Sequence, residues 1–173
     1  GYPVTAVDYT REMLEKAMEN AGNLCKKIDF YRMDAQNLGF EDNTFDVVIS
    51  RNLTWNLEKP EQAYRDWYRV LKPGGKLLNF DANWYGYLYD EQKRNAYEED
   101  RKSVEQLSLD DHYLCTDIDA MEQIALQMPL SSKMRPGWDM EILKRTGFAE
   151  IHTDTSVWER VWSKEEKLNY GST

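Results

Sequence analysis

The sequence predicts an α/β fold in which helices flank a mostly parallel sheet. Short apolar runs rich in Val, Ile and Phe recur through the first half of the chain, and amphipathic stretches of helical period separate them. Strands that alternate with helices pair in parallel through right-handed crossovers. After residue 83 this alternation stops, which predicts a helical insertion beside the sheet.

Four apolar runs predict strands at residues 3–8, 28–33, 45–50 and 76–81. Each run is short and rich in β-branched or aromatic side chains, as is typical of a buried strand. The turn-forming residues Glu41-Asp42-Asn43 precede the third run. The four runs therefore predict the strands of the sheet.

Two helices are predicted between these strands. The first begins after Thr10, which can cap it, and ends at Gly22. The second begins at Pro60 and stops at the turn Pro73-Gly74-Gly75. Apolar residues at helical spacing predict the buried faces of both helices: Met13, Leu14, Ala17, Met18 and Ala21 in the first, and Ala63, Tyr64, Trp67, Val70 and Leu71 in the second.

The second half of the chain predicts mainly helices. One helix is expected to begin at Thr116 or Asp117 and to end before Pro129, and a short one is expected to be capped by Asp139 and to end at Gly147. Alternating side chains at 148–157 predict a last strand. We divide the chain into a partial core (1–83), a helical lid or substrate insertion (84–137) and the C-terminal part of the core (138–173). A peripheral helical layer is the alternative to a lid.

The composition limits the class of partner. The net charge of −9 disfavours nucleic acid, which needs a positively charged surface. No apolar run approaches the roughly 20 residues that span a bilayer, so we expect no membrane partner. The two cysteines, Cys25 and Cys115, are too few for a disulfide scaffold and indicate a cytoplasmic protein. Neither cysteine has a nearby metal-ligating residue in the sequence, so no metal site is predicted.

Polar residues follow the predicted strands. Asp8, Asp34, Asn52, Asp81 and Asn83 come at or just after the ends of four apolar runs. The carboxyl ends of parallel strands lie at one edge of a sheet, where α/β proteins bind ligands. This pattern predicts a ligand site without reference to any family.

The runs 4–8 and 45–50 and the motif Leu71-Lys72-Pro73-Gly74-Gly75 together resemble the class I S-adenosylmethionine-dependent methyltransferases, in their type 11-like branch. The resemblance covers residues 1–83 well and 138–157 loosely. It implies a Rossmann-like sheet, S-adenosylmethionine as cofactor and methyl transfer to a small organic acceptor. The family's Gly-rich loop does not precede Asp8, so we expect an incomplete sheet at both ends and a chain that is a fragment.

The resemblance also assigns the cofactor-binding residues. It implies that Asp8 binds the ribose and that Tyr9 flanks the adenine. Asp34 then accepts from the adenine amine, and the amide of Ala35 donates to the ring. The residues that end the third strand lie beside the methyl donor: Ser50, Arg51 and Asn52. The alternatives are turn aspartates and a surface arginine.

The sequence is less specific about the residues that contact the acceptor than about those that bind the cofactor. Plentiful aromatic residues are consistent either with a packed thin domain or with a pocket for an organic substrate. The candidates for acceptor contact follow the third and fourth strands: Trp55, Asp81, Asn83, Trp84 and Tyr85. His112 and Arg51 are the catalytic candidates, His112 as a general base if the acceptor is a hydroxyl. A solvated histidine is the alternative, since positioning alone can promote methyl transfer.

Two other interpretations of the chain remain open. One is a catalytically inactive remnant that serves as a binding or oligomerisation module. The other is a fragment of an NAD-binding dehydrogenase, against which Asp34-Ala35 and the motif at residues 71–75 argue. Exposed strand edges next to the missing strand predict a homodimer. The atom that accepts the methyl group is not specified by the sequence.

Overall fold

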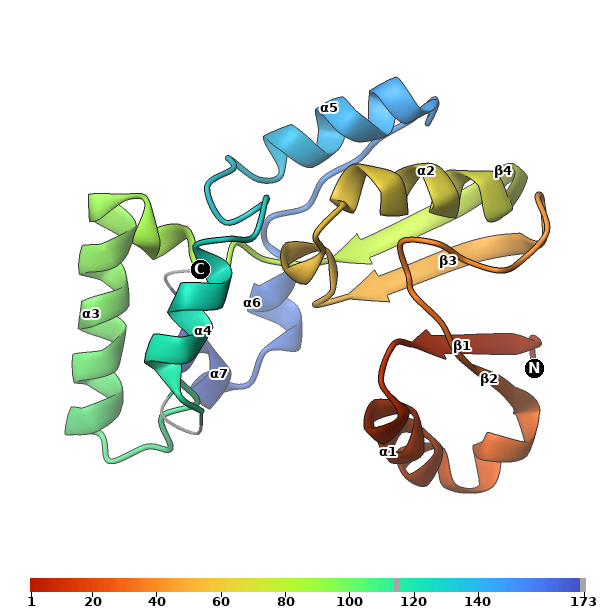
Figure 1. The fold of residues 1–173 in the computed structure, drawn as a ribbon. Helices are drawn as coiled ribbons and strands as arrows, with labels where there is room; N and C mark the ends of the chain where they lie inside the picture. Colours follow the sequence, from red (N-terminus) through yellow and green to blue (C-terminus); the bar gives the residue numbers. More distant parts are fainter. Residues whose placement is uncertain (114–115, 172–173) are drawn as a thin grey trace. The chain divides into compact units, whose positions relative to one another are not determined.

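The computed structural model describes residues 1–113 and 116–171 and divides the chain into two compact units (Figure 1). Unit 1 comprises Gly1–Val48 and Glu61–Leu77, and unit 2 comprises Ile49–Pro60 and Leu78–Thr173. The strands are β1 (Val4–Asp8), β2 (Ile28–Arg32), β3 (Phe45–Arg51) and β4 (Leu71–Phe80). The α-helices are α1 (Arg11–Ala21), α2 (Pro60–Val70), α3 (Glu91–Gln106), α4 (Ile118–Ala125), α5 (Gly137–Thr146), α6 (Val157–Val161) and α7 (Lys164–Tyr170), and the 3-10 helices are η1 (Gly22–Lys27), η2 (Thr54–Asn56) and η3 (Gly86–Leu88).

In unit 1, β1 and β2 form a two-stranded parallel sheet. Val4 pairs with Ile28, and Asp8 pairs with Arg32. The connecting helix α1 begins as predicted, because the Thr10 hydroxyl accepts from the amide of Met13, and it ends at Gly22. The prediction that Met13 lies in the core is wrong, since its side chain is 57% exposed. Of the apolar face expected for this helix, only Leu14 is buried.

β3 and β4 form a second two-stranded sheet. The amide of Thr44, just before β3, donates to the carbonyl of Val70, just before β4. The amide of Asn52, just after β3, donates to the carbonyl of Phe80 at the end of β4. Hydrogen bonds that join start to start and end to end mean that these strands also run in parallel. The mostly parallel α/β arrangement is therefore confirmed, as two separate pairs of strands.

The fourth strand begins earlier than predicted. The expected turn at Pro73-Gly74-Gly75 lies inside β4, which starts at Leu71 rather than at residue 76. Gly74 has a φ of 80°, a value that favours glycine. A β-carbon at Gly75 would lie 3.1 Å from the carbonyl oxygen of Asp46 in β3. The glycines thus permit close approach of the two strands instead of ending the ladder.

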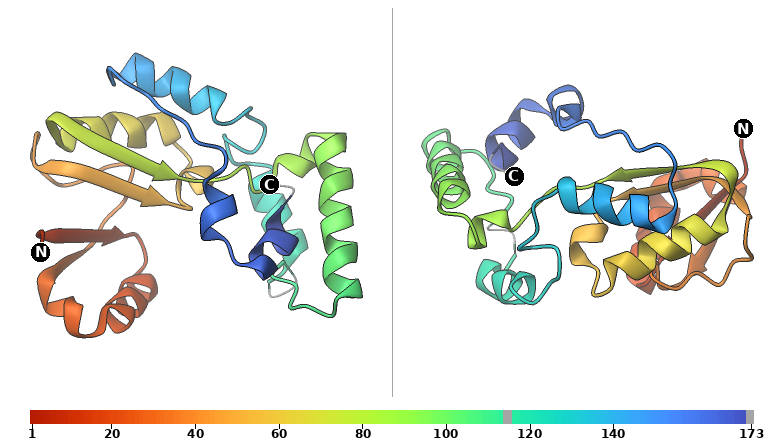
Figure 2. Two further views of the ribbon diagram at one scale, coloured as in Figure 1. Left: turned by 180° about the vertical axis from the view of Figure 1, so that it is seen from behind. Right: turned by 90° about the horizontal axis from the view of Figure 1, so that it is seen from above.

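The buried face predicted for α2 is confirmed. Ala63, Tyr64 and Val70 are fully buried, and Trp67 is 2% exposed. Figure 2 shows this helix along the amino-terminal parts of β3 and β4, within unit 1. α2 therefore supplies most of the buried apolar side chains of unit 1.

Unit 2 contains the helices predicted after residue 83. α3 packs against η3 and α7, and Figure 2 shows α7 beside it. α4 starts after Asp117, whose carboxylate caps the helix as predicted. The core of these helices is aromatic and centres on Tyr85, Tyr87 and Tyr113. Of the two cysteines, Cys25 is a free thiol, and Cys115 lies outside the described residues.

The C-terminal part of unit 2 differs from the prediction. α5 starts at Gly137, so Asp139 lies in its first turn instead of capping it. The strand predicted at 148–157 is wrong: within residues 1–113 and 116–171, strands are confined to β1–β4. A strand requires a neighbour to satisfy its backbone groups, and this segment has none among the described residues.

No helix in the described part of the chain has the length and apolar character needed to cross a bilayer.

Candidate functional site

In unit 1, two carboxylates lie at the ends of adjacent parallel strands. Asp8 ends β1, and Asp34 follows β2 by two residues, while the amide of Met33 donates to the carbonyl of Asp8 at 2.9 Å. Each side chain is oriented by a local turn: Oδ1 of Asp8 accepts from the Thr10 amide at 2.9 Å, and Oδ1 of Asp34 accepts from the Gln36 amide at 2.8 Å. The structure therefore brings these two predicted residues together.

The other two predicted residues of unit 1 lie beside these carboxylates. Tyr9 is 68% exposed, and its carbonyl accepts from the Arg32 guanidinium at 3.1 Å. Ala35 is held by α2, because its carbonyl accepts from the Trp67 indole at 2.8 Å. The Tyr9 ring is thus open to solvent, whereas the Ala35 backbone is anchored.

Helix α2 also orients the segment after Ala35, which the sequence did not suggest. Asp66 accepts from the amide of Leu38, and the guanidinium of Arg69 donates to the carbonyls of Leu38 and Phe40. Hydrogen bonds to Asp66, and then to Asp42, raise the pKa of Arg69 well above its ordinary value. The loop that carries Asp34 is therefore fixed by side chains about 30 residues later in the chain.

In unit 2, the end of β3 contains three predicted residues with different environments. Ser50 is buried, and its hydroxyl has no hydrogen-bond partner among the described residues. Arg51 is exposed. Asn52 has a φ of 51°, in the left-handed region that asparagine tolerates better than most residues. A buried hydroxyl without a partner and a left-handed residue are both features that occur at ligand sites.

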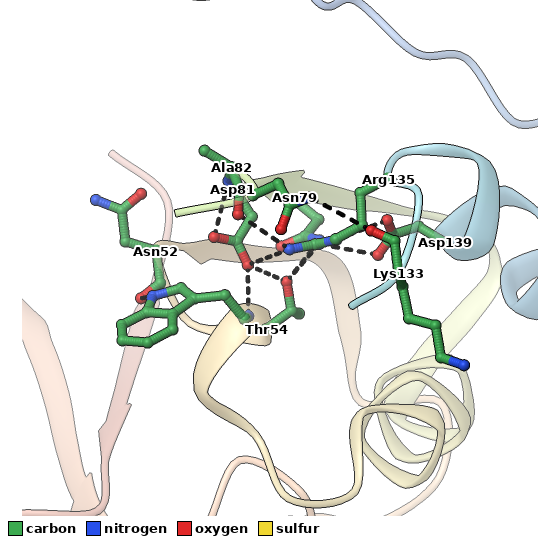
Figure 3. Close-up of polar contacts among 10 residues, drawn as sticks. Asn52, Thr54, Asn79, Asp81, Ala82, Lys133, Arg135 and Asp139 are labelled. Atoms are coloured by element: carbon green, nitrogen blue, oxygen red, sulfur yellow. Dashed lines mark hydrogen bonds and ion pairs between the residues drawn. The ribbon is translucent and has the colours of Figure 1, made fainter. Parts of the chain in front are cut away.

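A buried arginine joins the end of β4 to the start of α5 (Figure 3). The Arg135 guanidinium lies 3.2 Å from a carboxylate oxygen of Asp81 and 2.8 Å from one of Asp139. It also donates to the Thr54 hydroxyl at 2.8 Å. The three charged side chains are 8%, 2% and 10% exposed, respectively. One cation thus balances half of the charge of two buried carboxylates.

Neighbours in this cluster bind the carboxylate of Asp81. Its carboxylate accepts from the hydroxyl of Thr54 and from the amides of Trp55 and Ala82 (Figure 3). Asn83 donates from its side-chain amide to the carbonyl of Lys133 at 3.3 Å. Asp81, predicted as an acceptor contact, is therefore occupied in holding η2 against the end of β4. Arg135 and Asp139 had only one local signal in the sequence, their separation of four residues.

Aromatic side chains lie next to this polar cluster in unit 2. The rings of Trp55 and Tyr85 have centroids 5.4 Å apart, and those of Trp84 and Tyr170 are also 5.4 Å apart. His112, the predicted base, lies with Nδ1 2.9 Å from the hydroxyl of Tyr170. The predicted aromatic residues therefore pack with one another, and Tyr170 is a member of the group that the sequence did not indicate.

Burial affects the phenols of this group. Desolvation raises the pKa of Tyr113 and that of Tyr87 well above the ordinary value for tyrosine. Both hydroxyls are therefore protonated at neutral pH, and that of Tyr87 donates to Glu122 at 2.9 Å. No cluster of three or more metal-ligating side chains occurs among residues 1–113 and 116–171.

Comparison with known proteins identifies relatives of the first part of the chain. Residues 1–79 match the model of a family described as "Methyltransferase domain". The chain is similar to the ubiquinone/menaquinone biosynthesis C-methyltransferase UbiE of Ruegeria sp. (strain TM1040), with 40% identity over 76 residues, 43% of this chain and 30% of the relative. It is also similar to phosphoethanolamine N-methyltransferase 3 of Arabidopsis thaliana, with 35% identity over 78 residues, 45% of this chain and 16% of the relative.

A solved structure has a similar fold over a larger part of the chain than the sequence relatives cover. A candidate S-adenosyl-L-methionine-dependent methyltransferase of Methanococcus maripaludis matches with a TM-score of 0.53 and 21% identity, over 87% of this chain and 60% of that one. At this identity the match supports the fold alone. The chain spans less than a third of the length of the bacterial and plant relatives.

Proposed function

We propose that the chain belongs to the class I S-adenosylmethionine-dependent methyltransferases and that its protein transfers a methyl group from this cofactor to a small organic acceptor. The relatives include one C-methyltransferase and one N-methyltransferase, so the family leaves the acceptor atom open. The acidic net charge of −9 favours a small molecule over a nucleic acid.

One observation carries the proposal: Asp8 and Asp34 lie at neighbouring ends of two parallel strands. Oδ2 of Asp8 has no partner among the described residues, since the Thr10 contacts use Oδ1. A carboxylate can accept from both hydroxyls of a ribose, and a second one can accept from the exocyclic amine of adenine. These residues fit the nucleoside part of S-adenosylmethionine. The cofactor supplies an electrophilic methyl group when bound.

Calorimetric titration with S-adenosylhomocysteine tests the proposal. We expect the wild-type chain to bind and Asp8→Asn and Asp34→Asn to bind at least about tenfold more weakly, because each loses a charged acceptor. Asp29→Asn, at an exposed position of β2, is the matched control and should bind like the wild type. Equal affinity in all four proteins, or binding of NAD in place of S-adenosylhomocysteine, would contradict it.

We further propose a cytoplasmic protein that forms a homodimer. The exposed apolar side chains at the ends of β3 and β4 motivate the dimer: Ile49, Leu78 and Phe80 are 66%, 42% and 44% exposed. Burial of such side chains between two copies is favourable. Sedimentation equilibrium should show a dimer that dissociates on Ile49→Asp, and a monomeric wild type would refute it.

A further inference from the structure

The carboxylate of Asp8 is held by the peptide group that joins Tyr9 to Thr10. Its Oδ1 accepts from the Thr10 amide at 2.9 Å, which is one end of that peptide group. The other end, the carbonyl of Tyr9, accepts from Nε of Arg32 at 3.1 Å. A peptide group is planar and rigid, so a hydrogen bond to its carbonyl restricts the direction of its amide. Arg32 in β2 therefore helps to orient the carboxylate of Asp8 at the end of β1.

The carboxylate of Asp34 is held in the same way by the peptide group that joins Ala35 to Gln36. Oδ1 of Asp34 accepts from the Gln36 amide at 2.8 Å. The carbonyl of Ala35 accepts from the indole of Trp67 in α2, also at 2.8 Å. Trp67 is only 2% exposed, so little water competes for its N–H group. Each carboxylate thus contacts a peptide group whose far end is held by a distant side chain of unit 1.

Neither distant side chain occupies the carboxylate that it orients. Arg32 lies opposite Asp8 in the register of the sheet, yet within residues 1–113 and 116–171 its guanidinium donates to the Tyr9 carbonyl and not to a carboxylate. The Trp67 indole carries no charge, and its acceptor is also a carbonyl. Both aspartates therefore keep their charge, and both are only half-buried. This arrangement orients two acceptors and leaves them available to a ligand.

We infer that Arg32 and Trp67 are positioning residues that set the specificity for the nucleoside of the cofactor. The inference rests on the proposed methyltransferase function. Arg32 acts through Asp8 on the ribose, and Trp67 acts through Asp34 on the adenine. A hydrogen bond is strong only within a narrow range of distance and angle, so a carboxylate that rotates freely discriminates poorly between ligands. The two side chains thus set specificity through the backbone, and neither has to touch the cofactor.

Amide hydrogen exchange of the ligand-free chain, followed for single residues by NMR, tests the two linkages separately. Arg32→Met should speed exchange of the Thr10 amide about fivefold and leave that of Gln36 unchanged. Trp67→Phe should speed exchange of the Gln36 amide by a similar factor and leave that of Thr10 unchanged. Because Arg32 is exposed, Arg32→Met keeps the test decisive even if Trp67→Phe does not fold.

Calorimetric titration with three ligands tests the effect on specificity. The ligands are S-adenosylhomocysteine, its analogue without the ribose hydroxyl next to the base, and its inosine analogue, in which a carbonyl oxygen replaces the amine. The wild type should bind each analogue about tenfold more weakly than S-adenosylhomocysteine, because each analogue leaves one carboxylate unmatched. Arg32→Met should reduce discrimination against the deoxy analogue to about twofold and keep that against the inosine analogue. Trp67→Phe should give the reverse pattern.

Arg11→Met is the matched control for the arginine variant. Arg11 is an exposed arginine of unit 1, and its guanidinium pairs with Glu15 one turn later in α1. This variant removes the same charge and should keep the exchange rates and both discrimination ratios of the wild type. A purely structural role of Arg32 or Trp67 would instead weaken the binding of all three ligands by one common factor.

The outcomes separate the inference from the proposed function. A wild-type chain that does not bind S-adenosylhomocysteine would contradict the function and the inference with it. Binding without discrimination in the wild type, discrimination that survives in both variants, or a uniform loss of affinity would overturn the inference alone. Selective loss of ribose discrimination in Arg32→Met, and of adenine discrimination in Trp67→Phe, would support it.

Discussion

Each unit of the molecule contains an arginine between two aspartates, but the two arginines differ in burial. In unit 1, Arg69 is 33% exposed and contacts Asp66 and Asp42, of which Asp42 is 67% exposed. In unit 2, Arg135 is 8% exposed and contacts Asp81 and Asp139, which are 2% and 10% exposed. The same chemical grouping thus occurs once with a partly exposed arginine between a buried aspartate, Asp66 at 9%, and an exposed one, and once with all three side chains buried.

The difference teaches how each candidate ligand region is held. Arg69 anchors the loop after Asp34 through backbone carbonyls, and water can replace part of those contacts. Arg135 is the cation between two carboxylates that are almost wholly buried, so its removal leaves their charge in the interior without this counter-ion. We expect the strand ends of unit 2 to depend far more on a single side chain than those of unit 1.

The largest expected effect is that of Arg135→Met. It should lower the free energy of unfolding by about 3–5 kcal/mol, because Asp81 and Asp139 lose their cation. Arg69→Met should lower it by about 1–2 kcal/mol, the value of a few partly solvated hydrogen bonds. Denaturant unfolding followed by circular dichroism compares the two. Equal losses would mean that burial does not distinguish the arginines.

A second, smaller effect is expected within the helices of unit 2. The Asn169 side chain accepts from the His112 amide and donates to the carbonyls of Asp110 and Glu165. Asn169→Ala should lower the free energy of unfolding by about 2 kcal/mol, because it leaves buried partners unpaired. Asn95→Ala, at an exposed position of α3, is the control for truncation of an asparagine. A loss no greater than that of the control would contradict the expected role of Asn169.

Two tyrosine variants separate a paired from an unpaired hydroxyl. Tyr87 donates to Glu122 at 2.9 Å, so Tyr87→Phe should cost about 1 kcal/mol. Tyr113→Phe should leave stability unchanged or raise it, because the hydroxyl that it removes has no partner among the described residues. Thermal unfolding of both variants provides the measurement. A loss of stability in Tyr113→Phe would reveal an acceptor for that hydroxyl.

The smallest effect concerns an exposed pair in unit 2. Hydrogen bonds from Arg160 and Ser156 lower the pKa of Asp154 to about 2, from an ordinary value of 3.8. Because the folded-state pKa is the lower one, the pair adds stability above pH 3.8, and this contribution is lost as the pH falls toward 2. A carboxyl NMR titration should show the pKa rising in Arg160→Met and unchanged in Arg11→Met. No rise in Arg160→Met would mean that the pair does not form.

Local sequence signals predicted much of unit 1. The Thr10 cap, the stop at Gly22 and the helix that starts at Pro60 all depend on neighbours within a few residues, and all are present. The positions of Asp8 and Asp34 at strand ends follow from the same apolar runs. The clamp formed by Trp67 and Arg69 did not follow, because its partners lie about 30 residues away in the chain.

Local signals failed where an element needed a distant partner. The alternation at 148–157 satisfies the pattern of a strand, but no strand lies beside it within the described residues. Met13 fits the period of a buried helix face, yet no neighbouring element covers it. Periodicity indicates which side chains share a face, and it does not say whether that face is covered.

The sequence by itself determined the order of strands and helices in residues 1–83, the cap and stop of α1 and the carboxylates at the strand ends. Only the tertiary structure decided that Asp81 is committed to Arg135, which lies 54 positions later, and that the Tyr113 ring packs against Tyr170 with its hydroxyl buried. Caps and turns depend on backbone geometry over a few residues. Burial and long-range pairing depend instead on which surfaces the whole chain brings together. The free-energy contribution of a polar contact depends on how far its groups are removed from water.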